Sequence, residues 1–158
     1  MEHIRKAQRD DLSRIAEIFV FNNRINYLPI FRDEKFSFGT LQVVSVIDRY
    51  FGCDDIFKGI YVFDDGIIRG FIEINKTEIC KLYVDPFFQG KGIGGELIEF
   101  AKREHSADHL WALEKNHKAI AFYERHGFFP SSERKTEEGT DEFIIRMDHK
   151  KRLDTASL

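Results

Sequence analysis

Apolar stretches bounded by turn residues predict an antiparallel arrangement of strands in the middle of the chain. Residues 60–63 and 67–74 are two such stretches, and Asp65-Gly66 between them is typical of a tight hairpin turn. A second turn at Asn75-Lys76-Thr77 leads to a third strand over residues 78–84, which Asp85-Pro86 ends. Further short strands are predicted at residues 3–7, 109–113, 128–129 and 142–147.

Two helices are predicted before this hairpin. The first has apolar residues at Leu12, Ile15, Ile18 and Phe19, follows Asp10 or Asp11 as a cap and ends near Asn22-Asn23. A second helix is expected over residues 40–50, and residues 27–38 between the two show aromatic side chains without a period. This region is therefore expected to be irregular.

Two more helices are predicted in the second half of the chain. One carries Ile93, Leu97, Ile98 and Ala101 on a single face. The other begins at Asn116, a good N-cap, and ends where Gly127 supplies the left-handed residue that follows many helices. The order β-α-α-β-β-β-α-β-α-β-β predicts an α/β (mixed α+β) fold, with a mixed sheet and helices on both faces.

Length and composition are those of one globular domain, which we assign to residues 1–148, followed by a polar tail at 149–158. The chain has 158 residues and a formal charge of −3, so nucleic acid is not an expected partner. No apolar run reaches the ~18 residues that cross a bilayer, and the first residues do not form a secretory signal. We therefore expect no membrane association and a cytoplasmic location. Cys53 and Cys80 are expected to be buried, reduced thiols.

The stretch Gln89-Gly90-Lys91-Gly92-Ile93-Gly94-Gly95 carries the clearest chemical signal. It lies between a strand and an amphipathic helix, so the backbone N–H groups of the first helical turn have no partner within the helix. Glycine lets these amides approach a ligand closely, and the helix dipole adds positive potential. Lys91 adds a cation. This combination favours a phosphate or pyrophosphate ligand.

Two nucleotide motifs fit the same stretch incompletely. A P-loop would require Lys and then Ser or Thr where Glu96 and Leu97 stand, which disfavours a nucleoside triphosphatase. Gly90, Gly92 and Gly95 satisfy the dinucleotide fingerprint, but five residues separate them from the strand and too little chain follows for a doubly wound domain.

A second motif decides between these alternatives. Asn116-x-x-Ala119-x-x-Phe122-Tyr123-x-x-x-Gly127-Phe128 follows the glycine-rich loop. Together with Leu82-Tyr83-Val84-Asp85-Pro86 and the loop pattern Gln89-x-x-Gly92-x-Gly94, it resembles the GCN5-related N-acetyltransferase superfamily, whose members acylate amines with acetyl-CoA. The resemblance covers residues 3–147.

The resemblance implies a mostly antiparallel sheet of about six to seven strands whose central pair splays apart. It implies that the loop amides hold the pyrophosphate of CoA, that the backbone of the preceding strand pairs with the pantetheine arm, that Asn116 contacts this arm, and that Tyr123 protonates the departing thiolate. The cofactor-binding residues implied in this way are Leu82, Tyr83, Val84, Gln89, Gly90, Lys91, Gly92, Ile93, Gly94, Gly95 and Asn116. No metal is implied, and a homodimer is compatible with the family.

The general base is less constrained by the sequence. Glu78 opens the third central strand, where some relatives that acetylate protein lysines carry a catalytic Glu, and Glu73 on the adjacent strand is the competitor. Alternation predicts Glu78, Cys80, Leu82 and Val84 on one face of the strand. Relatives that acetylate ribosomal N-termini have a Glu where this chain has Trp111, which argues against that activity.

The expected function is direct transfer of an acetyl group from acetyl-CoA to a primary amine of a small molecule or a peptide, with residues 20–57 forming the acceptor side. Aromatic residues that could line an acceptor slot there are Phe19, Phe21, Tyr27, Phe31 and Tyr50. A non-catalytic acyl-CoA sensor and a small dinucleotide-binding module are the alternatives. His105 and His109 have the spacing of a metal pair, but no third ligand is near them in the sequence.

Overall fold

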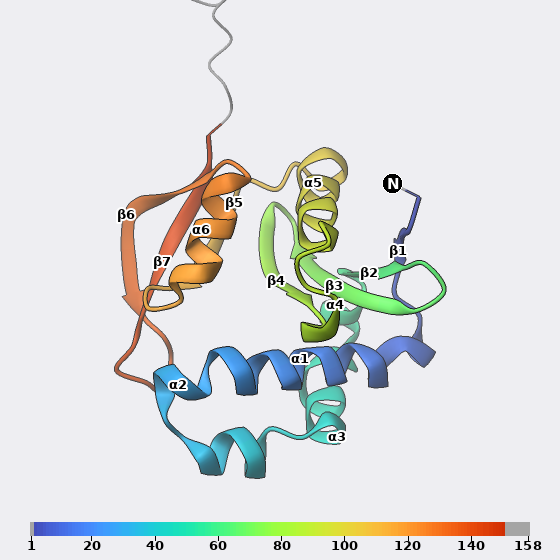
Figure 1. The fold of residues 1–158 in the computed structure, drawn as a ribbon, viewed down its shortest axis with the longest axis horizontal. Coiled ribbons are helices and arrows are strands. Elements are labelled where there is room, and N and C mark those ends of the chain that lie inside the picture. Colours follow the sequence, from blue (N-terminus) through green and yellow to red (C-terminus); the bar gives the residue numbers. More distant parts are fainter. Residues whose placement is uncertain (1, 151–158) are drawn as a thin grey trace, which may run out of the picture.

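A sheet of seven strands, in the order β1-β2-β3-β4-β5-β7-β6, runs through the molecule (Figure 1). The structure, a computed structural model, describes residues 2–150. All neighbouring strands are antiparallel except β4 and β5, which are parallel. The strands are β1 Ile4–Lys6, β2 Ile60–Asp64, β3 Ile68–Asn75, β4 Glu78–Val84, β5 His109–Leu113, β6 Phe128–Thr136 and β7 Phe143–His149. The predicted fold class is confirmed.

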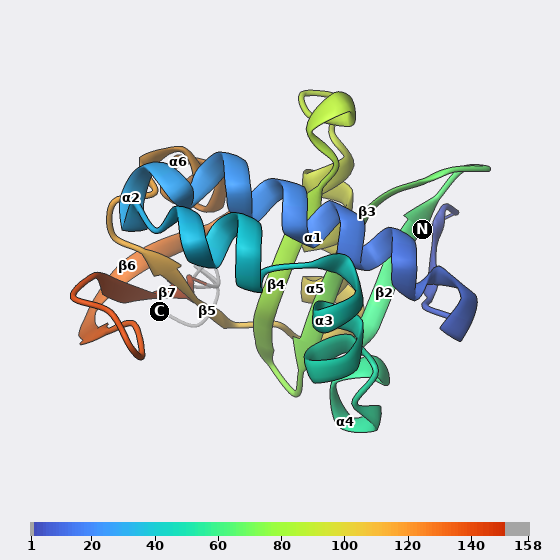
Figure 2. The same cartoon turned by 90° about the horizontal axis from the view of Figure 1, so that it is seen from below.

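Helices cover both faces of this sheet. The longer ones are α1 Leu12–Asn26, α5 Ile93–His105 and α6 His117–Arg125. The shorter ones are η1 Arg9–Asp11, α2 Leu28–Phe31, η2 Lys35–Thr40, α3 Val43–Val46, η3 Ile47–Phe51, α4 Asp54–Phe57 and η4 Pro86–Phe88. Figure 2 shows α1 and α3 crossing one face, while α5 lies on the other.

The sheet therefore separates two hydrophobic cores. On the α5 side, Leu97 and Ile98 are fully buried against Ile72 and Leu110. On the α1 side, Ile15 packs with a separate set of buried residues that includes Phe51 and Phe71. Burial of apolar side chains on both faces holds the strands between two helical layers, since apolar burial is the main stabilising term in folding.

The strand β4 departs from simple alternation near its start. The register with β3 shifts between Glu73 and Ile74, because Glu73 faces Lys81 while Ile74 faces Ile79, which leaves Cys80 as an extra residue. Such a β-bulge turns the residues before it to the opposite face. Ile79 accordingly joins Leu82 on the α5 side, so the prediction that Glu78 and Cys80 alternate onto the face of Leu82 is wrong.

The central strands β4 and β5 diverge, as the family resemblance implied. They pair only at Glu78–His109 and Ile79–Leu110, and in residues 2–150 no strand pairs with this edge of β4 beyond Ile79. Figure 1 shows the two strands separating, with α6 beside β5. The gap leaves backbone groups of β4 open to a ligand.

The segment between α1 and β2 differs most from expectation. The first helix runs to Asn26 rather than to Asn22-Asn23, and the carboxylate of Asp11 at its start binds Arg5 Nη1 at 2.8 Å instead of capping the helix. The predicted single helix over residues 40–50 is two short segments, α3 and η3, and the region expected to be irregular contains α2 and η2. Cys53 follows η3 and is exposed, so its predicted burial is wrong.

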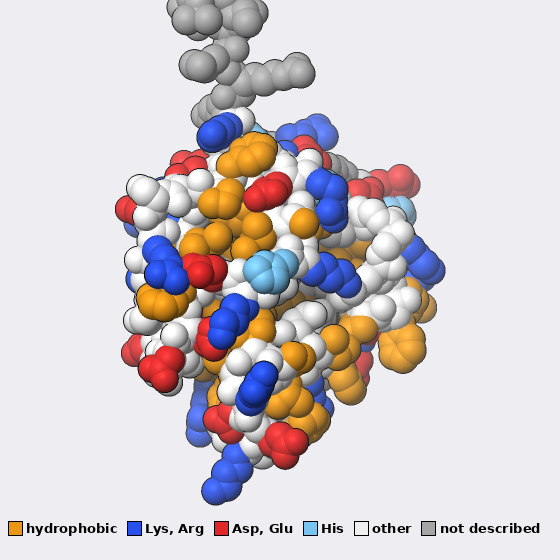
Figure 3. All heavy atoms as spheres, turned by 60° about the vertical axis from the view of Figure 1, so that its left-hand side comes forward, with side chains coloured by type: hydrophobic (Ala, Val, Ile, Leu, Met, Phe, Trp, Pro, Cys, Tyr) orange, Lys and Arg blue, Asp and Glu red, His pale blue; other side chains and the backbone are white. Residues whose placement is uncertain are grey.

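The last two strands are longer than predicted. Gly127 does have the left-handed conformation, with φ of 89°, and follows His126, the residue that caps the C-terminus of α6. The strand β7 ends at His149, inside the predicted tail, and residues 151–158 lie outside the described residues. Within residues 2–150, every helix is too short or too polar to cross a lipid bilayer. Figure 3 shows charges of both signs interspersed with apolar side chains on one face.

Candidate active site

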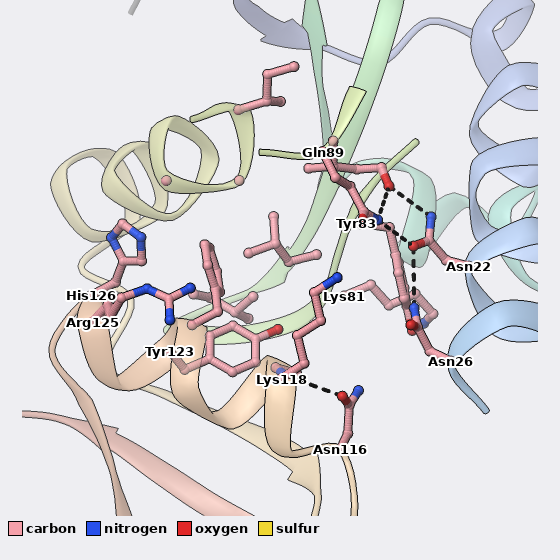
Figure 4. A pocket seen from close by; sticks show the side chains of 18 of the residues that line it. Asn22, Asn26, Lys81, Tyr83, Gln89, Asn116, Lys118, Tyr123, Arg125 and His126 are labelled. Atoms are coloured by element: carbon pink, nitrogen blue, oxygen red, sulfur yellow. Dashed lines mark hydrogen bonds between the residues drawn. The ribbon is translucent and has the colours of Figure 1, made fainter. Parts of the chain in front are cut away.

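A cavity of about 850 Å³ opens where β4 and β5 separate. Residues from α1, β4, the following loop, α5, β5 and α6 line it (Figure 4). Most site residues predicted from the sequence meet here: Leu82, Tyr83, Val84, Gln89, Gly90, Gly92, Ile93, Gly94, Gly95, Asn116 and Tyr123. Lys91 and Glu78 are not among the lining residues.

The backbone of β4 presents free polar groups to this cavity. Asp85 N donates to Arg69 O at 2.8 Å, and Gly70 faces Val84 in the antiparallel register. Because hydrogen-bonded and non-hydrogen-bonded pairs alternate along an antiparallel ladder, Val84 and Leu82 direct their N–H and C=O groups away from β3. The Leu82 groups and the Val84 N–H are therefore available to an extended ligand in the gap between β4 and β5, whereas the Val84 carbonyl already accepts from Asn22 and Gln89.

The loop after β4 ends at the N-terminus of α5. Gly92 is the N-cap, has φ of 83° and makes no side-chain cap, and a Cβ built on it would meet no atom within 4 Å. Its left-handed conformation favours glycine, and the space beside it is open toward a ligand. The amides of the first turn, which have no partner within the helix, together with the helix dipole can hold an anionic group such as a pyrophosphate.

The next two glycines allow α5 and α6 to approach closely. A Cβ on Gly94 would lie 3.2 Å from Phe122 Cζ, and one on Gly95 would lie 3.0 Å from His126 Cε1. The ring of His126 stacks on Phe122 with 4.6 Å between centroids. Burial and the neighbouring Lys102 lower the pKa of His126, so it is neutral at neutral pH.

A polar clamp joins α1 to the end of β4. Asn22, which is 2% exposed, donates from Nδ2 to Val84 O at 3.0 Å and to Ile18 O at 2.9 Å. Gln89 Nε2 donates to the same Val84 carbonyl at 3.1 Å and to Asn22 Oδ1 at 3.3 Å (Figure 4). The clamp fixes the peptide at which the strand leaves the sheet. Sequence analysis missed Asn22, because it was assigned only to the end of an amphipathic helix.

Helix α6 supplies two predicted residues from the opposite wall (Figure 4). Asn116 caps it, since Oδ1 accepts from Ala119 N at 3.3 Å, and the same side chain lines the cavity. The Tyr123 ring also lines the cavity, and burial raises the pKa of its hydroxyl. Tyr123 therefore keeps its proton at neutral pH and is available as an acid.

Two further tyrosines lie near Tyr123. The hydroxyl oxygens of Tyr27 and Tyr83 are 3.0 Å apart, joining the end of α1 to β4. Burial raises the pKa of both, so this part of the cavity carries neutral phenols. Of the aromatic residues proposed for an acceptor slot, Tyr27 lines this cavity, while Phe19 and Tyr50 line a smaller one on the other side of α1.

The candidate bases lie behind the cavity wall. Glu73 is buried, and its Oε1 accepts from Lys81 Nζ at 3.0 Å. Glu78 Oε2 accepts from the thiol of Cys80, with 3.3 Å between the two atoms, and Glu78 Oε1 lies 3.7 Å from His109 Nε2. Both Cys80 and Lys81 line the cavity. One side chain thus separates each carboxylate from the cavity: Lys81 in the case of Glu73, and Cys80 in the case of Glu78.

Cys80 is not an activated nucleophile. Burial, with the nearby carboxylates of Glu73 and Glu78, raises the pKa of its thiol to about 12. The thiol is therefore protonated at neutral pH, whereas a nucleophilic cysteine must be a thiolate. His109 does not belong to a metal cluster, since among residues 2–150 no three potential ligands are grouped.

Comparison with known proteins agrees with this geometry. The family model described as "Acetyltransferase (GNAT) domain" matches residues 55–130, which contain the loop and both motifs. Residues 55–130 thus carry a domain of the GCN5-related N-acetyltransferase (GNAT) superfamily.

Three relatives of this chain bear acetyltransferase names. An uncharacterized N-acetyltransferase of Methanocaldococcus jannaschii is 31% identical over 134 residues, which cover 79% of this chain and 59% of the relative. A peptidyl-lysine N-acetyltransferase of Escherichia coli is 27% identical and covers 79% of this chain and 82% of its own. A spermidine N(1)-acetyltransferase of Thermoplasma acidophilum is also 27% identical, and the match covers 79% of this chain and 86% of the relative. The chain thus spans about three fifths of the length of the Methanocaldococcus jannaschii relative.

Solved structures show the same GNAT fold. The apo form of YjaB from Escherichia coli superimposes with a TM-score of 0.75 at 17% identity, covering 92% of this chain and 95% of that one. An N-acetyltransferase from Thermoplasma acidophilum, solved in complex with coenzyme A, superimposes with a TM-score of 0.60 at 22% identity. The match covers 92% of this chain and 97% of that one.

Proposed function

We propose that this protein transfers the acetyl group of acetyl-CoA to a primary amine by direct attack in a ternary complex. The observation that carries the proposal is the cavity itself. It runs from the unpaired amides at the start of α5, along the open backbone of Leu82 and the Val84 N–H, to the buried hydroxyl of Tyr123. In addition, relatives of this protein bear acetyltransferase names, and a structural neighbour was solved with coenzyme A.

Each part of acetyl-CoA has a matching set of protein groups. The amides from Gly92 to Gly95 and the dipole of α5 suit the pyrophosphate. The pantetheine arm has amide groups that can pair with the backbone of Leu82 as an added strand would, which leaves the Val84 N–H for the thioester. Asn116 is placed to contact this arm from α6. The thioester then lies in the gap between β4 and β5.

The reaction requires three events at this thioester. A neutral amine attacks the carbonyl carbon, the carbonyl oxygen becomes negative, and the C–S bond breaks to release CoA thiolate. The N–H of Val84 is placed to stabilise the oxyanion, as backbone donors do in acyl transfer. Tyr123 gives its proton to the thiolate and recovers one from solvent. A thiol and a phenol differ by only ~1.5 units in ordinary pKa. Burial raises the pKa of Tyr123, and it raises the proton affinity of a thiolate released into the same cavity in the same direction, so the transfer is feasible.

The attacking amine must first lose a proton, and we assign this role to Glu78. Glu73 is engaged by Lys81, whereas Glu78 accepts only a weak hydrogen bond from the Cys80 thiol and lies 3.7 Å from His109 Nε2. The proton reaches Glu78 through water or through the Cys80 thiol, because Glu78 itself does not line the cavity. Glu73 remains the alternative base.

Thiol release from acetyl-CoA across a panel of amines tests the proposal. The panel contains amino acids, polyamines, alkylamines, aminoglycosides and peptides with a free lysine or N-terminus. Amine-dependent release establishes the activity. Binding of CoA without release by any amine would favour an acyl-CoA sensor of the same fold, and absence of CoA binding would contradict the assignment of the loop.

A further inference from the structure

The end of the cavity away from the glycine loop has walls suited to an apolar chain. We call this region the acceptor end and define it by Asn26, Tyr27, Cys80, Lys81, Tyr83 and Trp111, all of which line the cavity. Three of the six are aromatic. On β5, Leu110 and Ala112 belong to the core on the α5 side, so Trp111 between them faces the same side as Tyr83. Aromatic faces of this kind accommodate an alkyl chain and also attract an ammonium group.

The carboxylates near the acceptor end can compensate the charge of one bound ammonium group. No carboxylate lines this region; of the two behind it, Glu73 is neutralised by Lys81 at 3.0 Å. That leaves Glu78, whose charge reaches Cys80 and helps to raise the pKa of its thiol after burial and Glu73. Glu78 has His109 Nε2 at 3.7 Å but no lysine or arginine of residues 2–150 in an ion pair, so it can compensate one ammonium, whereas a second buried ammonium would have no counter-charge.

The surroundings of the acceptor end add cations as well as one carboxylate. Lys135 Nζ lies 4.3 Å from the centroid of the Trp111 ring. The charge of Glu137 contributes to the raised pKa of Tyr27, after burial. A long polyamine bound at the acceptor end would meet Lys81 in the wall and Lys135 against Trp111, while the Glu137 carboxylate could favour it.

From these walls and charges, we infer that the acceptor is a primary ammonium on an unbranched apolar stem without a second positive charge. A simple alkylamine and the side chain of a peptidyl lysine share this chemistry. The inference rests on the proposed function and deepens it, and it disfavours polyamines although one relative bears the name of a spermidine acetyltransferase.

A matched pair of amines isolates the second charge. n-Pentylamine and cadaverine have the same chain length and differ by one terminal ammonium. We expect kcat/KM for pentylamine to exceed that for cadaverine by about tenfold, the effect of roughly 1.4 kcal/mol. Nα-acetyl-lysine amide and a lysine-containing peptide, compared with pentylamine, then distinguish a peptide acceptor from a free amine. Equal or better use of cadaverine by the wild type would overturn the inference.

Variants connect the preference to the residues named. Lys81→Gln releases the carboxylate of Glu73. It should shift the ratio of kcat/KM for pentylamine to kcat/KM for cadaverine in favour of cadaverine by at least about fivefold, a shift of about 1 kcal/mol. Trp111→Glu, which adds a carboxylate directly, should do the same if the Lys81 variant folds poorly. Lys58→Gln removes a lysine from an exposed ion pair with Asp55, far from the cavity, and is the matched control. A ratio that stays constant in both site variants would contradict the charge argument.

Binding separates this inference from the proposed function. Calorimetric titration of the two amines into protein saturated with CoA needs no chemistry, so it reports the charge preference even if no amine is acetylated. Tighter binding of pentylamine without turnover would support the acceptor inference and contradict acetyl transfer. Glu137→Gln completes the set: if cadaverine binds well to the wild type and loses affinity in this variant, the acceptor is a diamine held at Glu137 and the inference is wrong.

Discussion

Asn22 on α1 donates a hydrogen bond to the backbone carbonyl of Val84, 3.0 Å away, at the point where β4 leaves the sheet. The carbonyl belongs to the residue whose N–H is assigned to the oxyanion. The two residues are 62 positions apart in the sequence, so a helix near the N-terminus holds the geometry of the acyl site.

Loss of this hydrogen bond should affect both stability and turnover. Asn22→Leu keeps the number of side-chain heavy atoms and the branch at Cγ but leaves Val84 O with one partner and Gln89 without its acceptor on α1. We expect the free energy of unfolding to fall by about 1–3 kcal/mol and kcat to fall more than the affinity for CoA. Chemical denaturation and steady-state kinetics measure the two effects. The exposed Asn75 offers a control, since Asn75→Ala should alter stability by less than about 0.5 kcal/mol.

The conformation of Gly92 predicts a specific loss of CoA binding. In Gly92→Val, the side chain enters the open space where the pyrophosphate is proposed to bind and also opposes a φ of 83°. Affinity for CoA, measured by calorimetry, should fall at least about tenfold. Gly66, with φ of 108° and equally open space, lies in the β2–β3 turn, so Gly66→Val carries similar strain away from the site. If both variants lost the same affinity for CoA, backbone strain alone would explain the effect, and the assignment of Gly92 to the pyrophosphate site would be contradicted.

Tyr123→Phe should slow the chemical step. Removal of a general acid costs on the order of a hundredfold in kcat, and the binding of CoA should change little because the ring remains. Burial raises the pKa of Tyr123, so the phenol stays protonated as pH rises through 7 to 9, and kcat should not decline there through its ionisation. Tyr61→Phe, at a ring packed on Phe100 outside the cavity, is the control. A Tyr123→Phe enzyme with wild-type kcat would remove the acid assignment.

The protonated thiol of Cys80 predicts that no acetyl-enzyme forms. Its pKa is raised to about 12, so the thiolate that could accept an acetyl group is scarce at every pH below that value. Mass spectrometry of protein incubated with acetyl-CoA, without an amine, should show the unmodified chain. Cys80→Ala should keep kcat within about tenfold of the wild type. A stable acetyl adduct at Cys80 that an amine discharges would replace direct transfer by a two-step route.

The donor half of the site was predictable because its signals are local. Gly92 requires a left-handed conformation, Asn116 caps a helix, and β4 and β5 begin and end as their apolar runs indicate. These features depend on neighbours along the chain, and the pattern of glycine and cap residues encodes them directly.

The acceptor half was not predictable for physical reasons. The bulge at Cys80 adds one residue to β4 without any Gly or Pro to mark it, so simple alternation gave Glu78 the wrong face. Asn22 and Trp111 enter the cavity through tertiary packing, and no local pattern distinguishes Asn22 from other polar residues of α1. The short helices between Tyr27 and Phe51 follow no apolar period in the sequence; α2 buries none of its residues and η2 only Ser37, and the segment packs against α1.

The most direct test of the account follows a labelled acetyl group from acetyl-CoA to an amine. Purified protein, acetyl-CoA carrying a heavy-isotope acetyl group and n-pentylamine or a lysine peptide are incubated together, and CoA and the acetylated amine are quantified by mass spectrometry. The account predicts equal amounts of CoA and labelled N-acetyl product, with formation suppressed in Tyr123→Phe. Release of CoA with free acetate and no acetylated amine, or no release despite bound acetyl-CoA, would contradict it.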